Sequence, residues 1–176
     1  MNFYISILCS IYVFLISHFL FGCARERDAR SDTDESAEPY KIVCTVGMIT
    51  DIVGNLAGDY AEVEGIIGEG IDPHLYKPTR GDVIKLNQAD VVFYNGLLLE
   101  GRMTDVLISV ASKGKLVKAV TEAILEETDY LLEKDDGSAY TDPHVLMDVY
   151  GWLSSIAVFA ETLAAYDPEN AESYRS

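Results

Sequence analysis

Apolar positions from residue 41 onward alternate between two spacings, one typical of strands and one typical of helices. Short runs rich in β-branched residues predict strands, and apolar residues that recur every three or four positions predict helices. Strands are expected at 41–46, 63–67, 91–94 and 115–120. One helix is expected after each strand, and the apolar positions that mark the four helices are Ile49, Ile52, Val53, Leu56 and Ala57, then Val83, Ile84 and Leu86, then Met103, Val106, Leu107 and Val110, and finally Leu153, Ile156, Ala157, Ala160, Leu163 and Ala164.

Residues at the expected helix ends support these assignments. Gly58 suits a helix stop, and Thr79 with Asp82 resembles a capping box at the start of the second helix. Asp167 and Pro168 offer an N-cap and a proline at the first helical position, so a fifth helix is expected in 167–176.

Regular alternation of strands and helices with short connections is typical of a parallel sheet covered by helices. We therefore expect an α/β fold over residues 41–166, with a four-stranded, mainly parallel sheet and helices on both faces. Sites in such open sheets form at the carboxyl ends of the strands. His74 follows the second expected strand and His144 follows the fourth across a long loop, so both histidines should reach the same edge.

The first 22 residues have a different composition, because positions 2–22 carry no acid, lysine or arginine. The apolar run ends in Leu20-Phe21-Gly22-Cys23, which resembles a bacterial lipobox, a signal that is cut before a cysteine that is then acylated. We interpret 1–22 as a lipoprotein signal peptide and Cys23 as the lipidation site; the alternative is a signal anchor that stays uncut. Residues 23–40 hold six acids and no bulky aliphatic side chain, which predicts a flexible tether.

Charge and cysteine content narrow the possible functions. A net charge of −16 argues against nucleic acid and against anionic lipid as partners, and it is compatible with attracting cations. Cys9 lies in the signal and Cys23 is the predicted lipidation site, so Cys44 has no partner for a disulfide. Its apolar surroundings predict a small core residue.

The three histidines suggest a metal site that is only half built. His18 lies in the signal, and the other two each follow Asp-Pro, at 72–74 and 142–144. Proline stiffens a loop, and the aspartate before it either orients the imidazole or forms the turn. Zinc prefers four ligands and manganese usually takes more, so two imidazoles are too few. Asp148 lies near His144 but is more simply a helix-start acid.

Four stretches of the mature chain match a known family, and they read VGMITDIVGNLAGD, GIDPHLYKPTRGDVIKLNQADVVFYNGLLLEG, DPHVLMDV and AAYDPENAESYRS. Through them the chain resembles the substrate-binding lipoproteins of manganese/zinc ABC importers. That resemblance implies two α/β lobes joined by a long helix, with the metal between the lobes. It also implies that His74 and His144 are the two ligands of the N-terminal lobe, with the remaining ligands in a second lobe. The chain resembles the N-terminal lobe with the start of the linking helix at 167–176, and is expected to be a fragment.

The resemblance implies an extracytoplasmic receptor that captures Mn²⁺ or Zn²⁺ and delivers it to the permease and ATPase of an ABC importer. The lipid on Cys23 would anchor it to the membrane, at the outer face of a cytoplasmic membrane or in a periplasm. The resemblance also implies that a zinc-specific member often has a histidine-rich loop before the second Asp-Pro-His. Here the loop 122–141 contains no histidine, which favours manganese or a mixed specificity. An alternative is a surface adhesin or interaction module without transport. A metallohydrolase is not expected, because the sequence offers no positioned base.

Overall fold

The computed structural model of the chain describes residues 38–127 and 142–176. The predicted signal peptide, Cys23, most of the predicted tether and residues 128–141 lie outside these described residues. Within the described ranges, no helix combines the length and the apolar character that a membrane crossing requires.

One four-stranded sheet forms the centre of the unit that spans Glu38–Ser176. Its strands are β1 (Tyr40–Val46), β2 (Ala61–Ile67), β3 (Val91–Tyr94) and β4 (Leu116–Ala119). They are parallel throughout and lie in the order β2-β1-β3-β4. The four predicted strands and the parallel sheet are therefore confirmed.

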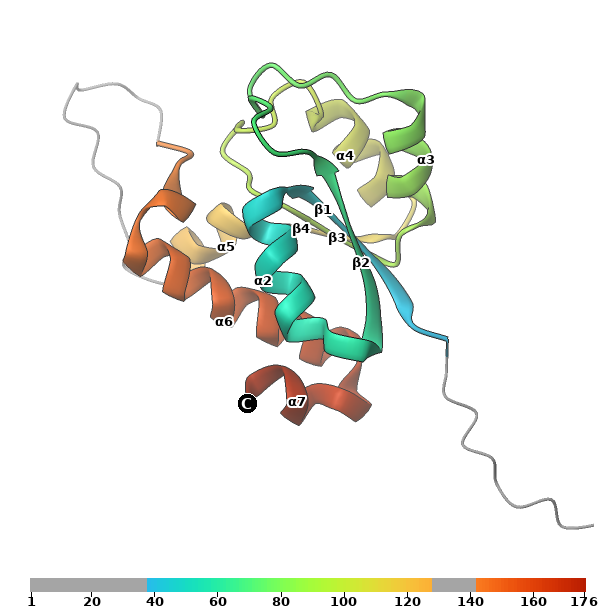
Figure 1. The fold of residues 1–176 in the computed structure, drawn as a ribbon, viewed down its shortest axis with the longest axis vertical. Coiled ribbons are helices and arrows are strands. Elements are labelled where there is room, and N and C mark those ends of the chain that lie inside the picture. The colour runs from blue at the N-terminus through green and yellow to red at the C-terminus, as the bar shows by residue number, and fades with distance from the viewer. Residues whose placement is uncertain (1–37, 128–141) are drawn as a thin grey trace, which may run out of the picture. The chain divides into compact units, whose positions relative to one another are not determined.

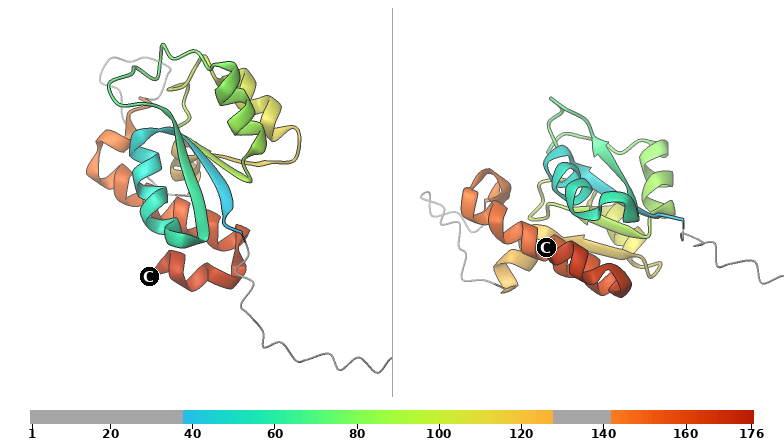
Figure 2. Two further views of the ribbon diagram at one scale, coloured as in Figure 1. Left: turned by 45° about the vertical axis from the view of Figure 1, so that its right-hand side comes forward. Right: turned by 60° about the horizontal axis from the view of Figure 1, so that its bottom comes forward.

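Helices cover both faces of this sheet (Figures 1 and 2). Successive residues of a strand point to opposite faces, so Ile42 and Cys44 of β1 enter one apolar cluster and Val43 enters the other. The first cluster contains residues of α2, α5, α6 and α7, and the second contains residues of α3 and α4. The helices are α2 (Gly47–Ala57), α3 (Arg80–Gln88), α4 (Thr104–Ala111), α5 (Val120–Glu127), α6 (Val149–Tyr166) and α7 (Ala171–Arg175), with 3₁₀ turns η1 (Gly58–Tyr60), η2 (Val145–Met147) and η3 (Pro168–Asn170).

Helix α5 was not predicted, and the expected fourth strand was too long at its carboxyl end. Val120 begins α5 instead of ending β4. Val120, Ala123 and Ile124 are buried at helical spacing, so the signal was present but short. The acidic residues that follow made this stretch look like the start of a surface loop.

Three of the apolar positions that marked the predicted helices are exposed. Ile84 of α3 is 46% exposed, Leu153 of α6 is 58% exposed, and Ala157 of α6 is exposed as well. Ile84 lies two residues from the buried Asp82 and two from the buried Leu86, which puts it on the opposite side of the helix. The buried side of α6 instead includes Ser155, Phe159 and Leu163.

The expected helix after Asp167 begins with the 3₁₀ turn η3, which has Pro168 at its start, and continues as the short α7. Tyr174 of α7 is 1% exposed. Its hydroxyl donates to the Asp167 carboxylate at 2.6 Å and lies 3.1 Å from the hydroxyl of Tyr40 in β1. These contacts fix the carboxyl-terminal helix against the sheet.

Candidate metal site

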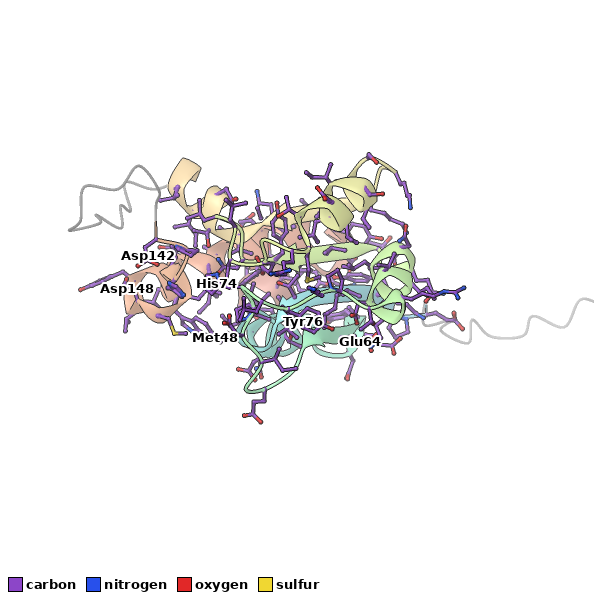
Figure 3. All side chains as sticks on the ribbon, turned by 90° about the horizontal axis from the view of Figure 1, so that it is seen from above. Met48, Glu64, His74, Tyr76, Asp142 and Asp148 are labelled. Carbon is purple, nitrogen blue, oxygen red and sulfur yellow. The ribbon has the colours of Figure 1, made fainter. Side chains whose placement is uncertain are left out.

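His74 and His144 lie together at the carboxyl ends of the strands, as predicted. His74 is in the segment between β2 and α3, and His144 directly precedes η2. Their Nε2 atoms are 3.3 Å apart, and the two rings are tilted by 64° with centroids separated by 5.3 Å. Figure 3 shows His74 on the same side of the molecule as Asp142 and Asp148. The parallel sheet thus brings together two residues that are 70 positions apart.

The separation of the two nitrogens fits two ligands of one metal ion. Two Zn–N bonds of about 2.0–2.1 Å that meet at a tetrahedral angle place their nitrogens about 3.3–3.4 Å apart. The observed distance of 3.3 Å matches this spacing. Both imidazoles are exposed, so an ion has access to them from solvent.

The two aspartates that precede these histidines act differently. Asp72 accepts a hydrogen bond from the His74 backbone N–H at 2.9 Å, which closes a turn. Asp142 accepts the same bond from His144 at 2.9 Å, and its Oδ1 also lies 2.7 Å from His144 Nδ1. Of the two roles left open by the sequence, Asp72 forms the turn and Asp142 both forms the turn and orients the imidazole. A carboxylate on Nδ1 leaves Nε2 for a metal.

The segment that carries His74 is anchored to the start of α3. Tyr76 donates its hydroxyl to Asp82 Oδ2 at 2.7 Å, and the Thr79 backbone N–H donates to the same oxygen at 2.7 Å. Thr79 Oγ1 in turn accepts from the Asp82 N–H at 3.3 Å, which completes the predicted capping box. Burial alone would raise the pKa of Asp82, but hydrogen bonds from Tyr76 and Thr79 outweigh it and lower the pKa.

Asp148 is a helix cap, as predicted. Its carboxylate accepts hydrogen bonds from the backbone N–H groups of Tyr150 and Gly151, both at 3.0 Å. This cap begins α6 and holds the turn η2 beside His144. Asp148 thereby supports the loop.

Cys44 belongs to the core. It is fully buried in β1, and burial raises the pKa of its thiol to about 12. A thiol that stays protonated is a poor metal ligand. The prediction of a small core residue is confirmed.

The histidines line a cavity of about 810 Å³. Its wall includes the acidic residues Asp51, Glu69 and Asp72, which make it attractive to a cation. Among the residues described, no three His, Cys, Asp or Glu side chains are grouped so that they could hold an ion. The described part of the chain therefore brings two imidazoles together at this place.

Asn95 also belongs to the surroundings of the two histidines, and no motif in the sequence singles it out. It follows β3, lines the same cavity and is 1% exposed. Its Nδ2 donates to the Pro143 carbonyl at 2.8 Å, directly before His144. The sequence pattern carries no signal for a partner 48 residues away.

Comparison with known proteins identifies relatives for this arrangement. Residues 42–176 match the family model of the periplasmic zinc-uptake complex component A. The manganese-binding lipoprotein MntA of Bacillus subtilis is 33% identical over 156 residues, which are 89% of this chain and 48% of that protein. The zinc-binding protein TroA of Treponema pallidum is 41% identical over 127 residues, which are 72% of this chain and 40% of that protein.

Solved structures share the fold. The TroA structure superposes with a TM-score of 0.70 at 38% identity, covering 78% of this chain and 48% of that one. A Mn-bound periplasmic metal binding protein of Candidatus Liberibacter asiaticus gives 0.68 at 28% identity, covering 77% and 49%. The chain spans about half the length of the relatives that it matches.

Proposed function

The chain belongs to the family of the periplasmic zinc-uptake complex component A, and from this premise we propose that it captures a divalent cation for import. In this proposal His74 and His144 are two ligands of a transported Mn²⁺ or Zn²⁺ ion, and an ABC permease with its ATPase receives the ion. The observation that carries the proposal is the distance of 3.3 Å between the two Nε2 atoms.

The ligand chemistry agrees with a transition metal. Neutral imidazole binds zinc well, and with added oxygen ligands a mixed site also suits manganese. Divalent ions follow an order of affinity that favours zinc over manganese, so selectivity depends on geometry and on the remaining ligands. Two ligands give a weak site that further ligands strengthen. The relatives are named for manganese and for zinc, which supports this class of ion.

Anchoring and location form a second part of the proposal. Cys23 carries a lipid after the signal 1–22 is removed, and 23–40 tethers the lobe 41–166 outside the cytoplasm. The names of the relatives as lipoproteins support this location. The role proposed for the chain is binding, without catalysis.

Alanine substitutions of the two histidines test the ligand assignment. The chain is titrated with Zn²⁺ alone and with Mn²⁺ alone, and His74→Ala and His144→Ala are compared with wild type. Each substitution removes one of two ligands, so affinity should fall at least about 10-fold. Leu153→Ala is the matched control, because Leu153 is exposed and does not line the cavity. Unchanged affinity in both histidine variants would overturn the assignment.

A further inference from the structure

The backbone groups of His144 bond within their own loop. The His144 N–H is bonded to Asp142, and the His144 carbonyl accepts from Met147, so both bonds are local. Pro143 has no N–H, and its carbonyl is its one backbone hydrogen-bonding group. That carbonyl accepts from Asn95 Nδ2 at 2.8 Å. This hydrogen bond ties the loop of His144 to the end of β3.

Asn95 is itself held rigidly. Its backbone N–H donates to Glu100 Oε1 at 2.8 Å, and its carbonyl accepts from Thr121 at 2.9 Å. The orientation of its amide is fixed, because Nδ2 faces the carbonyl oxygens of Gly96 and Pro143. A flipped amide would place an oxygen against both of these oxygens. The Asn95 side chain is thus a fixed donor aimed at the segment before His144.

The turn after Asn95 has an unusual conformation that maintains this arrangement. Leu97 and Leu98 both have positive φ, at 47° and 62°, which is uncommon for leucine. Glu122 Oε1 accepts from the Leu97 N–H at 2.9 Å, and Glu100 Oε2 accepts from Gly96 at 3.2 Å. Backbone strain of this kind persists where the surroundings fix it, and it gathers at functional sites.

Gly96 shows how closely the turn is packed. Its φ is 93°, and a Cβ at this position would lie 1.7 Å from Glu122 Oε2. Asn95 Oδ1 is buried and has no hydrogen-bond partner among the described residues. An unpartnered buried oxygen lowers stability. Stability alone therefore does not account for an asparagine here, whereas a donor to Pro143 does.

We propose that Asn95 is a positioning residue for the metal site, which holds His144 at ligand distance from His74 through the Pro143 carbonyl. This inference rests on the proposed function, because it assumes that both histidines bind the ion. Asn95 makes no contact with the ion in this account. Its loss lets the His144 loop move, so that binding must first order it.

Two substitutions at Asn95 test the proposal with Zn²⁺ alone as the probe. Asn95→Ala removes the donor, and Asn95→Leu removes both polar atoms while keeping most of the volume. Both should weaken Zn²⁺ binding about 10- to 100-fold, the usual loss when a residue that supports a metal ligand is removed. Asn87→Ala is the control, because Asn87 also donates to a carbonyl, that of Val83 within α3, and lies outside the cavity.

A second readout separates positioning from a general loss of structure. In the metal-free chain, hydrogen exchange at the His144 amide should accelerate in both Asn95 variants and stay unchanged in Asn87→Ala. Asn95→Leu also removes the unpartnered Oδ1, so its resistance to urea should equal or approach wild type while its affinity falls. Lower affinity together with nearly unchanged resistance to urea is not expected of a residue whose only role is to stabilise the fold.

The outcomes distinguish this proposal from the function that it assumes. If His144→Ala weakens Zn²⁺ binding but Asn95→Leu stays within twofold of wild type, Asn95 does not position the ligand. If His144→Ala leaves binding unchanged, the proposed function itself fails. If only Asn95→Ala loses affinity and it also unfolds, the loss comes from unfolding and the positioning role is overturned.

Discussion

At the scale of single residues, His74 and His144 turn their Nε2 atoms toward each other. For His144, the neighbouring Asp142 sets this orientation. Asp142 Oδ1 lies 2.7 Å from His144 Nδ1, which leaves the second nitrogen free to bind an ion. His74 has its backbone fixed by Asp72. In the proposed site both imidazoles must be neutral, so protons compete with the metal for their nitrogens.

Metal binding should weaken in acid for this reason. Ligation requires neutral imidazole, so protons compete with Zn²⁺ and affinity is expected to be lower at pH 5.5 than at pH 7.5. The two rings are close, and protonating both would add repulsion between like charges. Titrations at pH 7.5, 6.5 and 5.5 measure the effect. An affinity that stays flat across this range would argue against histidine ligands.

Some of the structural elements around the histidines could be predicted from residues close in sequence, and others could not. The strands, the capping box of α3 and the stop at Gly58 were predicted, because each depends on residues close in sequence. Helix α5 was missed because its apolar stripe is short and is followed by acids.

The contact between Asn95 and Pro143 could not be predicted either. It depends on the direction of one side chain after the sheet has formed. The meeting of His74 and His144 was expected because both follow the carboxyl ends of parallel strands, but their separation of 3.3 Å was not.

The capping box of α3 makes a testable contribution at the scale of the element. Thr79→Ala should lower the free energy of unfolding by about 1 kcal/mol, because the Asp82 N–H loses its side-chain acceptor. Ser154→Ala is the control, since that exposed hydroxyl only bonds to a carbonyl within α6. Urea unfolding of both variants measures the difference. Equal losses of unfolding free energy in the two variants would show that the Thr79 cap contributes no more than the hydroxyl bond of Ser154.

The stability that this capping box contributes should depend on pH. The folded state lowers the pKa of Asp82, so the ionised carboxylate adds to the free energy of unfolding above the unfolded pKa. This contribution is lost as the pH falls through the lower pKa of the folded state. Wild type should therefore lose stability in acid more steeply than Asp82→Asn. Urea unfolding at neutral pH and at acidic pH near the ordinary aspartate range tests this. Identical slopes for both proteins would contradict the assignment.

At the scale of the whole molecule, α6 joins the site to the core. Its start lies beside His144, and further along Phe159 packs edge-on against Phe93 of β3 with centroids 5.1 Å apart. Phe159 is fully buried, whereas Leu153 on the same helix is largely exposed. The sheet, α6 and the His144 loop are thus one packed unit, and the surrounding acidic chain, with a net charge of −16, favours cations near it.

Phe159→Ala should destabilise this unit by about 3–5 kcal/mol, because it leaves a cavity against the sheet. Leu153→Ala should cost far less, because that side chain is mostly in water already. Chemical denaturation of the two variants provides the comparison. A loss at Leu153 as large as that at Phe159 would mean that α6 packs by its other side.

We propose that one ion binds to the Nε2 atoms of His74 and His144 together. X-ray absorption spectroscopy of the chain loaded with one equivalent of Zn²⁺ counts these ligands. We expect two imidazole nitrogens at about 2.0–2.1 Å from the metal in the wild-type chain. We expect one in His74→Ala and one in His144→Ala. A spectrum without two imidazoles, or one that neither substitution changes, would rule out this shared site.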